Sequence, residues 1–198
     1  LLNGPHTVLS PVTYLSGVNI VRDACEHPVL GKYIHKVQFD ELMQTLNLPM
    51  DELQKFASDV LERFENPFVD HQVTSIMLNS FPKYETRDLP GVKVYLERKG
   101  ELPQGLVFGL AAIITYYKGG TRADGAPIQP QDDQKIIDKL KELWATGDTQ
   151  KVAEGVLAFD YIWKEDLNKT VPGLTELVKK DLDLIQEKGM LEAVKTIL

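Results

Sequence analysis

The sequence is poor in the features that would assign a class at once. Its 198 residues hold a single cysteine, Cys25, which excludes an internal disulfide framework and a cysteine-rich zinc site. The longest apolar run, 106–117, is broken by a glycine and is too short to span a bilayer. No signal peptide opens the chain, so we expect a cytoplasmic protein with no membrane partner.

Positive charge is also scarce. The chain has 22 Lys and Arg against 29 Asp and Glu, a formal net charge of −7. This balance argues against nucleic acid as a partner, because such binding neutralises phosphates with basic side chains. The hydrophobic share of 43% is that of an ordinary globular protein. We therefore expect one folded domain covering residues 1–198.

Strand signals are missing too. No segment alternates apolar and polar residues for long, and no hairpin turn separates two such segments. Apolar residues recur instead every three or four positions, so we predict an all-α fold. The helix over 103–118 is apolar nearly all round, which predicts a central, buried position.

The other expected helices and loops follow from the same periodicity and from Pro and Gly residues. The helices cover 6–21 with a break or kink at Pro11, a segment after Pro28, 50–64, 131–146, 172–189 with Pro172 in its first turn, and a short stretch at the end. The loops are expected at 66–67, 88–91 and 118–130.

The familiar signatures of cofactor and nucleophile sites are absent as well. The sequence has no glycine-rich dinucleotide fingerprint, no P-loop and no Gly-x-Ser-x-Gly elbow. Its four histidines do not pair at the spacing of a zinc site, so we expect no metal. Neighbouring carboxylates, as in Asp132 with Asp133 and Asp181 with Asp183, fit the solvated faces of amphipathic helices.

Two segments hold polar side chains that this description leaves unexplained. The first is the start of the chain, where Asn3 and His6 are three residues apart and project to the same side of a helix. Asn can donate to a developing oxyanion, and His can donate to or accept from a substrate hydroxyl. The alternative is structural, with Asn3 forming a turn or capping the helix.

The second segment spans 63–71 and 79–87, where a loop, a short helix and a turn are rich in polar groups. Lys83 and Arg87 could face one anion, such as a carboxylate. The structural alternative is that Arg63 and Asp70 tie the loop down while Lys83 points into solvent.

Residues 1–7, 63–72 and 78–90 together resemble the C-terminal domain of the mannitol dehydrogenase family. Within that family the motif Asn-Pro-Phe-x-Asp-His-Gln is most similar to that of the tagaturonate reductases, also called altronate oxidoreductases. The family comprises zinc-independent long-chain polyol dehydrogenases with an N-terminal dinucleotide domain and an all-helical C-terminal substrate domain. The resemblance covers nearly the whole chain.

This resemblance implies a chemistry. Such enzymes interconvert a secondary alcohol and a ketone by hydride transfer with a nicotinamide cofactor, here D-altronate and D-tagaturonate with NAD. A lysine is the general acid/base, an asparagine five residues later polarises the carbonyl, and a histidine three further on orients the substrate. Asn3 and His6 match the last two positions, while the lysine would precede Leu1. We therefore expect this chain to be inactive alone and to pack against its own N-terminal dinucleotide domain, which binds most of the NAD.

A sugar-acid substrate also needs a cation for its carboxylate. The resemblance implies that Lys83 supplies it, that Arg87 is a second candidate, and that Asn79 hydrogen-bonds a substrate hydroxyl. The alternatives are a mannitol or fructuronate reductase of the same family and a non-enzymatic helical interaction module. The enzyme hypothesis expects Asn3, His6 and Lys83 to converge on one open, polar concavity.

Overall fold

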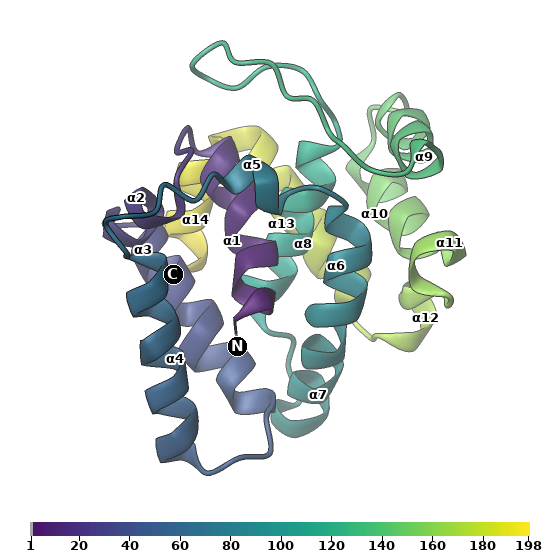
Figure 1. Cartoon of the computed structure of the whole chain (residues 1–198). Helices are drawn as coiled ribbons and strands as arrows, with labels where there is room; N and C mark the ends of the chain where they lie inside the picture. The colour runs from purple at the N-terminus through teal and green to yellow at the C-terminus, as the bar shows by residue number, and fades with distance from the viewer. Residues whose placement is uncertain (1) are drawn as a thin grey trace.

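The computed structural model describes residues 2–198 and is built from helices joined by short connections (Figure 1). The all-α prediction is confirmed, since residues 2–198 contain no strand and only two isolated bridges, Ile20 with Gln72 and Thr121 with Pro127. The elements in chain order are α1 (Asn3–Leu15), α2 (Val21–Glu26), α3 (Leu30–His35), the π-helix η1 (Lys36–Glu41), the 3-10 helix η2 (Leu42–Thr45), α4 (Met50–Phe64), α5 (Val73–Ile76), α6 (Ser80–Arg87), α7 (Leu89–Lys99), α8 (Gln104–Tyr116), α9 (Gln134–Trp144), α10 (Thr149–Leu157), α11 (Asp160–Trp163), α12 (Leu167–Thr170), α13 (Leu174–Lys188) and α14 (Met190–Ile197).

Helix α8 is the centre of the fold, as its sequence predicts. Its residues from Gly105 to Ile114 are all buried, and α1 and α13 pack along it. Gly109 makes the contact with α1 possible, because a Cβ there would lie 2.4 Å from the Cβ of Val8. None of the helices within residues 2–198 is long and apolar enough to cross a membrane.

Helix α4 has the bounds that its periodicity predicts, but its apolar stripe is only partly used. Its buried side chains are those of Leu53, Ala57, Val60 and Phe64. Met50 and Phe56 belong to the predicted stripe, yet each is 46% exposed. Helix α4 lies on the outside of the domain (Figure 1), and part of its apolar stripe is not covered by the other helices.

The helix predicted over 6–21 is instead α1, which ends at Leu15, and α2, which begins at Val21. Three further predictions that involve proline were wrong. Pro11 lies inside α1, which runs unbroken to Leu15, because packing against α8 outweighs the cost of a missing hydrogen bond. Only Asp88 separates α6 from α7, because Pro90 lies in the first turn of α7, where its missing N–H costs nothing. Pro172 stays outside α13, which begins at Leu174 after a left-handed glycine.

One carboxylate expected in solvent is buried. Asp181 has no exposed surface, and both of its oxygens accept hydrogen bonds from Gln104 Nε2, at 3.1 and 3.0 Å. Burial raises the pKa of Asp181 to about 7. Its neighbour Asp183 is partly exposed and pairs with Lys179 at 2.6 Å, as expected for a surface carboxylate. Helical periodicity alone could not separate the two, because Asp181 is buried through its contact with α8.

Asp181→Asn should therefore stabilise the chain at high pH and not at low pH. Between pH 4 and pH 7 the folded state keeps a proton that the unfolded state has released, so wild-type stability falls as pH rises through this window. The advantage of the variant in the free energy of unfolding should grow by about 4 kcal/mol from pH 4 to pH 8. Urea unfolding at several pH values measures it. Asp183→Asn is the matched control and should lack this gain; an advantage of Asp181→Asn that does not change with pH would contradict the prediction.

Candidate functional site

The first turns of α1 present the two predicted catalytic side chains. Asn3 is exposed, His6 is half-buried, and the helix start lies between α4 and α6 (Figure 1). The His6 ring packs on Phe64 at the end of α4, with ring centroids 4.0 Å apart. It also meets the ring of His71 edge-on, at 5.4 Å. Within residues 2–198 the side-chain amide of Asn3 makes no hydrogen bond, so it is available to a ligand.

The surroundings of His6 keep it neutral. Burial, then the nearby His71 and Arg87, lower the pKa of His6 to about 4. At neutral pH one ring nitrogen therefore donates a hydrogen bond and the other accepts one. Its Nε2 is buried and has no partner among the described residues. A neutral imidazole suits recognition of a hydroxyl group, as the sequence predicts.

Arg87 reaches the same place from α6. Its Nη1 lies 3.4 Å from the hydroxyl oxygen of Thr7, which in turn donates to the backbone carbonyl of Asn3 at 3.0 Å. The Arg87 side chain is exposed and forms no ion pair with a carboxylate in the described part of the chain. It also borders a hollow of about 190 Å³ that Gly4 and Leu46 line. The structure thus brings Asn3, His6 and Arg87 together.

Lys83 lies one helical turn before Arg87 and is less free than the sequence suggests. Its Nζ donates to the backbone carbonyl of Ile76 at 2.7 Å, and the side chain is half-buried. Burial lowers the pKa of Lys83, and Arg87 adds to this effect. Helices α1 and α6 pack side by side, but no contact joins Lys83 to Asn3 or His6 in the described part of the chain. Lys83 is therefore not in free solvent, as the structural alternative expected, but its bond to the Ile76 carbonyl is itself a structural contact.

The loop after α4 is held by a different pair from the one expected. Asp70 pairs with Arg22 at 2.9 Å, and Arg22 also donates to the carbonyl of Pro67 at 3.1 Å. Arg63, the predicted partner of Asp70, forms no ion pair within residues 2–198. Arg22 lies far away in sequence, so only the folded chain could identify it.

Asn79 is not brought to the start of α1. It precedes α6 in a left-handed conformation, φ 53°, and its N–H donates to the carbonyl of Gln131 at 3.0 Å. Helix α6 therefore separates Asn79 from the Arg87 end by about 12 Å of helix axis. Its predicted contact with a substrate hydroxyl has less geometric support than the roles of Asn3 and His6.

Comparison with known proteins assigns the family. The profile described as the mannitol dehydrogenase C-terminal domain matches residues 1–186. The chain belongs to the mannitol dehydrogenase family. Relatives named altronate oxidoreductase are 80% identical in Phocaeicola vulgatus and 79% identical in Bacteroides thetaiotaomicron, over the whole of this chain. One from Escherichia coli O139:H28 is 40% identical over 202 residues. The chain spans about two fifths of the length of these curated relatives, 41% of each.

Two solved structures share the mannitol dehydrogenase fold with this chain. A ternary complex of Pseudomonas fluorescens mannitol 2-dehydrogenase with NAD and D-mannitol superposes with a TM-score of 0.86 at 19% identity, covering all of this chain and 39% of that one. A substrate-free D-sorbitol dehydrogenase gives 0.81 at 22% identity, covering 98% and 39%. At these identities the likeness concerns the fold. The predicted resemblance and the predicted fold class are both confirmed.

This member of the mannitol dehydrogenase family has two site neighbours that the sequence did not single out. His71 lies within the Asn-Pro-Phe-Val-Asp-His-Gln motif, but the motif does not indicate that its loop folds back onto α1. Asp88 is fully buried below the start of α1, and a Cβ on Gly4 would lie 2.8 Å from its Oδ1. Burial raises the pKa of the Asp88 carboxyl well above its usual range. No sequence signal distinguishes this aspartate from an exposed one.

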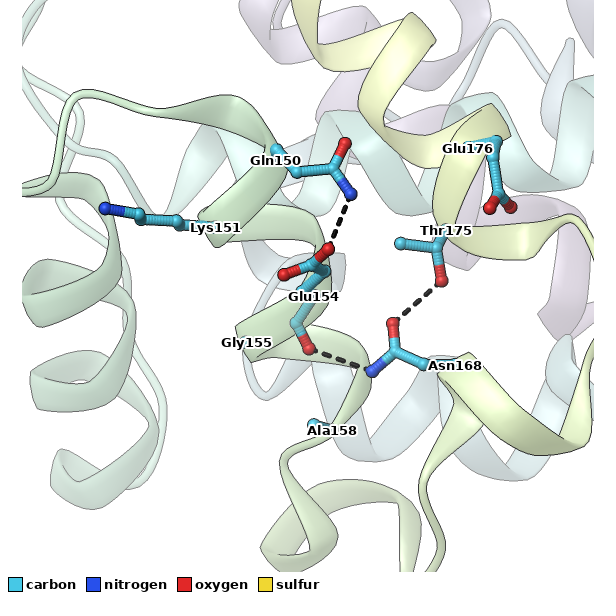
Figure 2. Close-up of a pocket in the computed structure, with 8 residues that line it drawn as sticks. All are labelled: Gln150, Lys151, Glu154, Gly155, Ala158, Asn168, Thr175 and Glu176. Carbon is cyan, nitrogen blue, oxygen red and sulfur yellow. Dashed lines mark hydrogen bonds between the residues drawn. The ribbon is translucent and has the colours of Figure 1, made fainter.

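A larger hollow lies elsewhere on the domain and is not the candidate site. It measures about 610 Å³ and lies among α10, α12 and α13 (Figure 2). Its polar side chains bond to one another, since Thr175 donates to Asn168 at 2.7 Å and Gln150 donates to Glu154 at 2.7 Å. Lys151 points away from the other side chains (Figure 2). Four of the polar side chains that line this hollow are thus already bonded to one another in pairs.

The described residues do not fit a cofactor cradle. With no strand within residues 2–198, the strand–turn–helix unit that binds a pyrophosphate has no counterpart in this part of the chain. The same residues contain no group of three His, Cys, Asp or Glu side chains placed to hold a metal ion.

Proposed function

We propose that the complete protein containing this chain is an NAD-dependent oxidoreductase that interconverts D-altronate and D-tagaturonate, and that this chain is its substrate-binding helical domain. The observation that carries the proposal is the meeting of Asn3, His6 and Arg87 at the exposed start of α1. The high identity to relatives named altronate oxidoreductase supports the same substrate pair.

In this proposal Asn3 binds the reacting oxygen and His6 binds a hydroxyl on a neighbouring carbon. The Asn3 amide donates to the oxygen that carries negative charge during reduction of the ketone, which lowers the barrier without a metal. The neutral His6 holds a neighbouring hydroxyl and so orients the reacting carbon. The proton-transferring lysine that the resemblance implies would be supplied from outside residues 1–198.

The substrate carboxylate is proposed to bind Arg87 first and Lys83 second. Arg87 offers an exposed guanidinium fork beside Thr7, a geometry that suits two parallel hydrogen bonds to a carboxylate. Lys83 already donates one hydrogen bond to the carbonyl of Ile76 and contributes mainly positive potential.

NAD is proposed to bind a dinucleotide domain outside this chain, and that domain is proposed to cover the start of α1. Large apolar side chains are exposed around α4, notably Phe68 in the loop after it at 93% and Leu48 before it at 60%. His6 packs on Phe64 at the end of α4, so the loop that carries Phe68 begins next to this site and fits a contact with that domain. Leu48 lies at the opposite end of α4 and does not distinguish that domain from a separate interaction module.

The test is an assay of the complete protein. NADH oxidation should be fastest with tagaturonate when tagaturonate, fructuronate and fructose are compared at equal concentration. Faster turnover of fructuronate or fructose would show that the proposed substrate is wrong, while the assignment to the mannitol dehydrogenase family would stand. No turnover of any of the three by folded protein, with NADH or NADPH, would refute the proposed activity.

Arg87→Gln should separate charged from neutral substrates. Loss of a hydrogen-bonded charge pair costs about 1.5–3 kcal/mol, so KM for tagaturonate should rise about 10–100-fold. KM for the neutral ketose fructose should change less than twofold, and Lys83→Met should have a smaller effect than Arg87→Gln. Arg63→Gln, an exposed arginine on α4, is the matched control. Equal losses on tagaturonate and fructose would contradict the role of Arg87.

A further inference from the structure

His71 is an exposed histidine that has no role in the function proposed above. It ends the Asn-Pro-Phe-Val-Asp-His stretch and stands edge-on to the His6 ring, with centroids 5.4 Å apart and planes at 72°. Its imidazole therefore faces the same approach to α1 as the two proposed catalytic side chains.

The backbone around His71 is fixed on both sides. The His71 carbonyl accepts the N–H of Val21 at 3.0 Å, and the N–H of Val73 donates to the carbonyl of Asn19 at 2.9 Å. These bonds frame the isolated antiparallel bridge of Ile20 with Gln72. A loop held in this way presents His71 in one place, and such preorganisation is what a binding group requires.

The charges near His71 favour an anion. His71 and Arg87 both neighbour His6, and the Arg87 guanidinium contributes positive charge there. The nearest carboxylate along the chain, Asp70, is engaged by Arg22 at 2.9 Å. Asp88 is buried next to Gly4, and burial raises its pKa well above its usual range. Asp70 therefore does not compete for a hydrogen bond that His71 donates.

We propose that His71 is a substrate-binding residue that donates a hydrogen bond to the carboxylate-bearing end of a sugar-acid substrate, in addition to Arg87. This inference rests on the proposed function and adds a specificity determinant from a second element, the loop after α4. It makes selection of an anionic substrate depend on two segments that are far apart in sequence.

The test compares two replacements of His71 in the complete protein. His71→Phe keeps a ring against His6 but removes the N–H donor, whereas His71→Gln keeps a donor of similar length. We expect His71→Phe to raise KM for tagaturonate about tenfold, the loss of one hydrogen bond to a charged group, with kcat within threefold of wild type. His71→Gln should recover most of the loss, and KM for fructose should stay within twofold in both variants. His35→Gln, on an exposed histidine that stacks on Phe39, is the matched control.

The outcomes separate this inference from the proposed function. Wild-type turnover of tagaturonate together with an unchanged KM in His71→Phe would overturn the role of His71 and leave the proposed function intact. Equal losses on tagaturonate and fructose would show a structural role for the ring and overturn the inference as well. Absence of wild-type activity on tagaturonate would refute the proposed function and, with it, this inference.

Discussion

Asn3→Ala should lower kcat of the complete protein for tagaturonate by about 100–1,000-fold and leave KM nearly unchanged. This is the usual cost of removing one fixed donor to a developing oxyanion, because the interaction is strongest in the transition state. Asn3 lies on the first turn of α1, and its side-chain amide has no partner among the described residues, so the amide is free to serve the substrate.

Steady-state kinetics of NADH oxidation measure the effect. Asn3→Asp is the matched variant, because it keeps the shape but places an acceptor where a donor is needed, and it should lose at least as much activity. The melting temperature should not change, since the only intramolecular bond of Asn3 seen here uses its backbone carbonyl. A kcat within threefold of wild type in Asn3→Ala would contradict the proposed role.

Gly109→Ala should destabilise the chain by about 3 kcal/mol or more, although the same change in an isolated helix is favourable by about 1 kcal/mol. The new Cβ would lie 2.4 Å from Val8 Cβ and 3.0 Å from the Tyr33 hydroxyl. Val8 Cβ is bonded directly to the backbone, so no rotamer change relieves the clash and α1 has to move away from α8. Because α1 carries Asn3 and His6, the variant should also lose activity in the complete protein.

Urea unfolding of Gly109→Ala and wild type measures the loss. Gly91→Ala is the matched control, because Gly91 also lies in a helix but a Cβ there meets the tip of Leu42 at 3.2 Å and the Thr45 hydroxyl at 3.7 Å. We expect this control to change stability by less than about 1 kcal/mol. If Gly109→Ala were as stable as wild type, the tight crossing of α1 and α8 would be refuted.

The sequence predicted the helices best where periodicity and helix ends agree. Helix α4 has the predicted bounds because its apolar spacing, its acidic first turn and the breaker after it all act within a few residues. Helix α8 was predicted to be central because it is apolar on every side. Helix α1 was predicted with a break that does not occur, since the packing that stabilises Pro11 in a helix comes from elements distant in sequence.

The candidate site was predicted in part. The spacing of Asn3 and His6 and the resemblance placed both side chains on one face of α1, where the structure has them. Lys83 was preferred to Arg87, but the structure engages Lys83 with the carbonyl of Ile76 and brings Arg87 to Thr7. The choice depends on how α6 packs on α1, and the sequence of α6 does not contain that information.

By itself, the sequence determined the helical class of this protein, its family and the turn of helix that holds Asn3 and His6. Each of these follows from residues that are neighbours along the chain, or from motifs that can be recognised one by one. The tertiary structure alone decided that Asp181 and Asp88 are buried, that Arg22 holds Asp70, and that His71 faces His6. Burial, ion pairs and close helix crossings depend on contacts between elements that are far apart in sequence. They therefore form only when helices such as α1, α6 and α8 pack together.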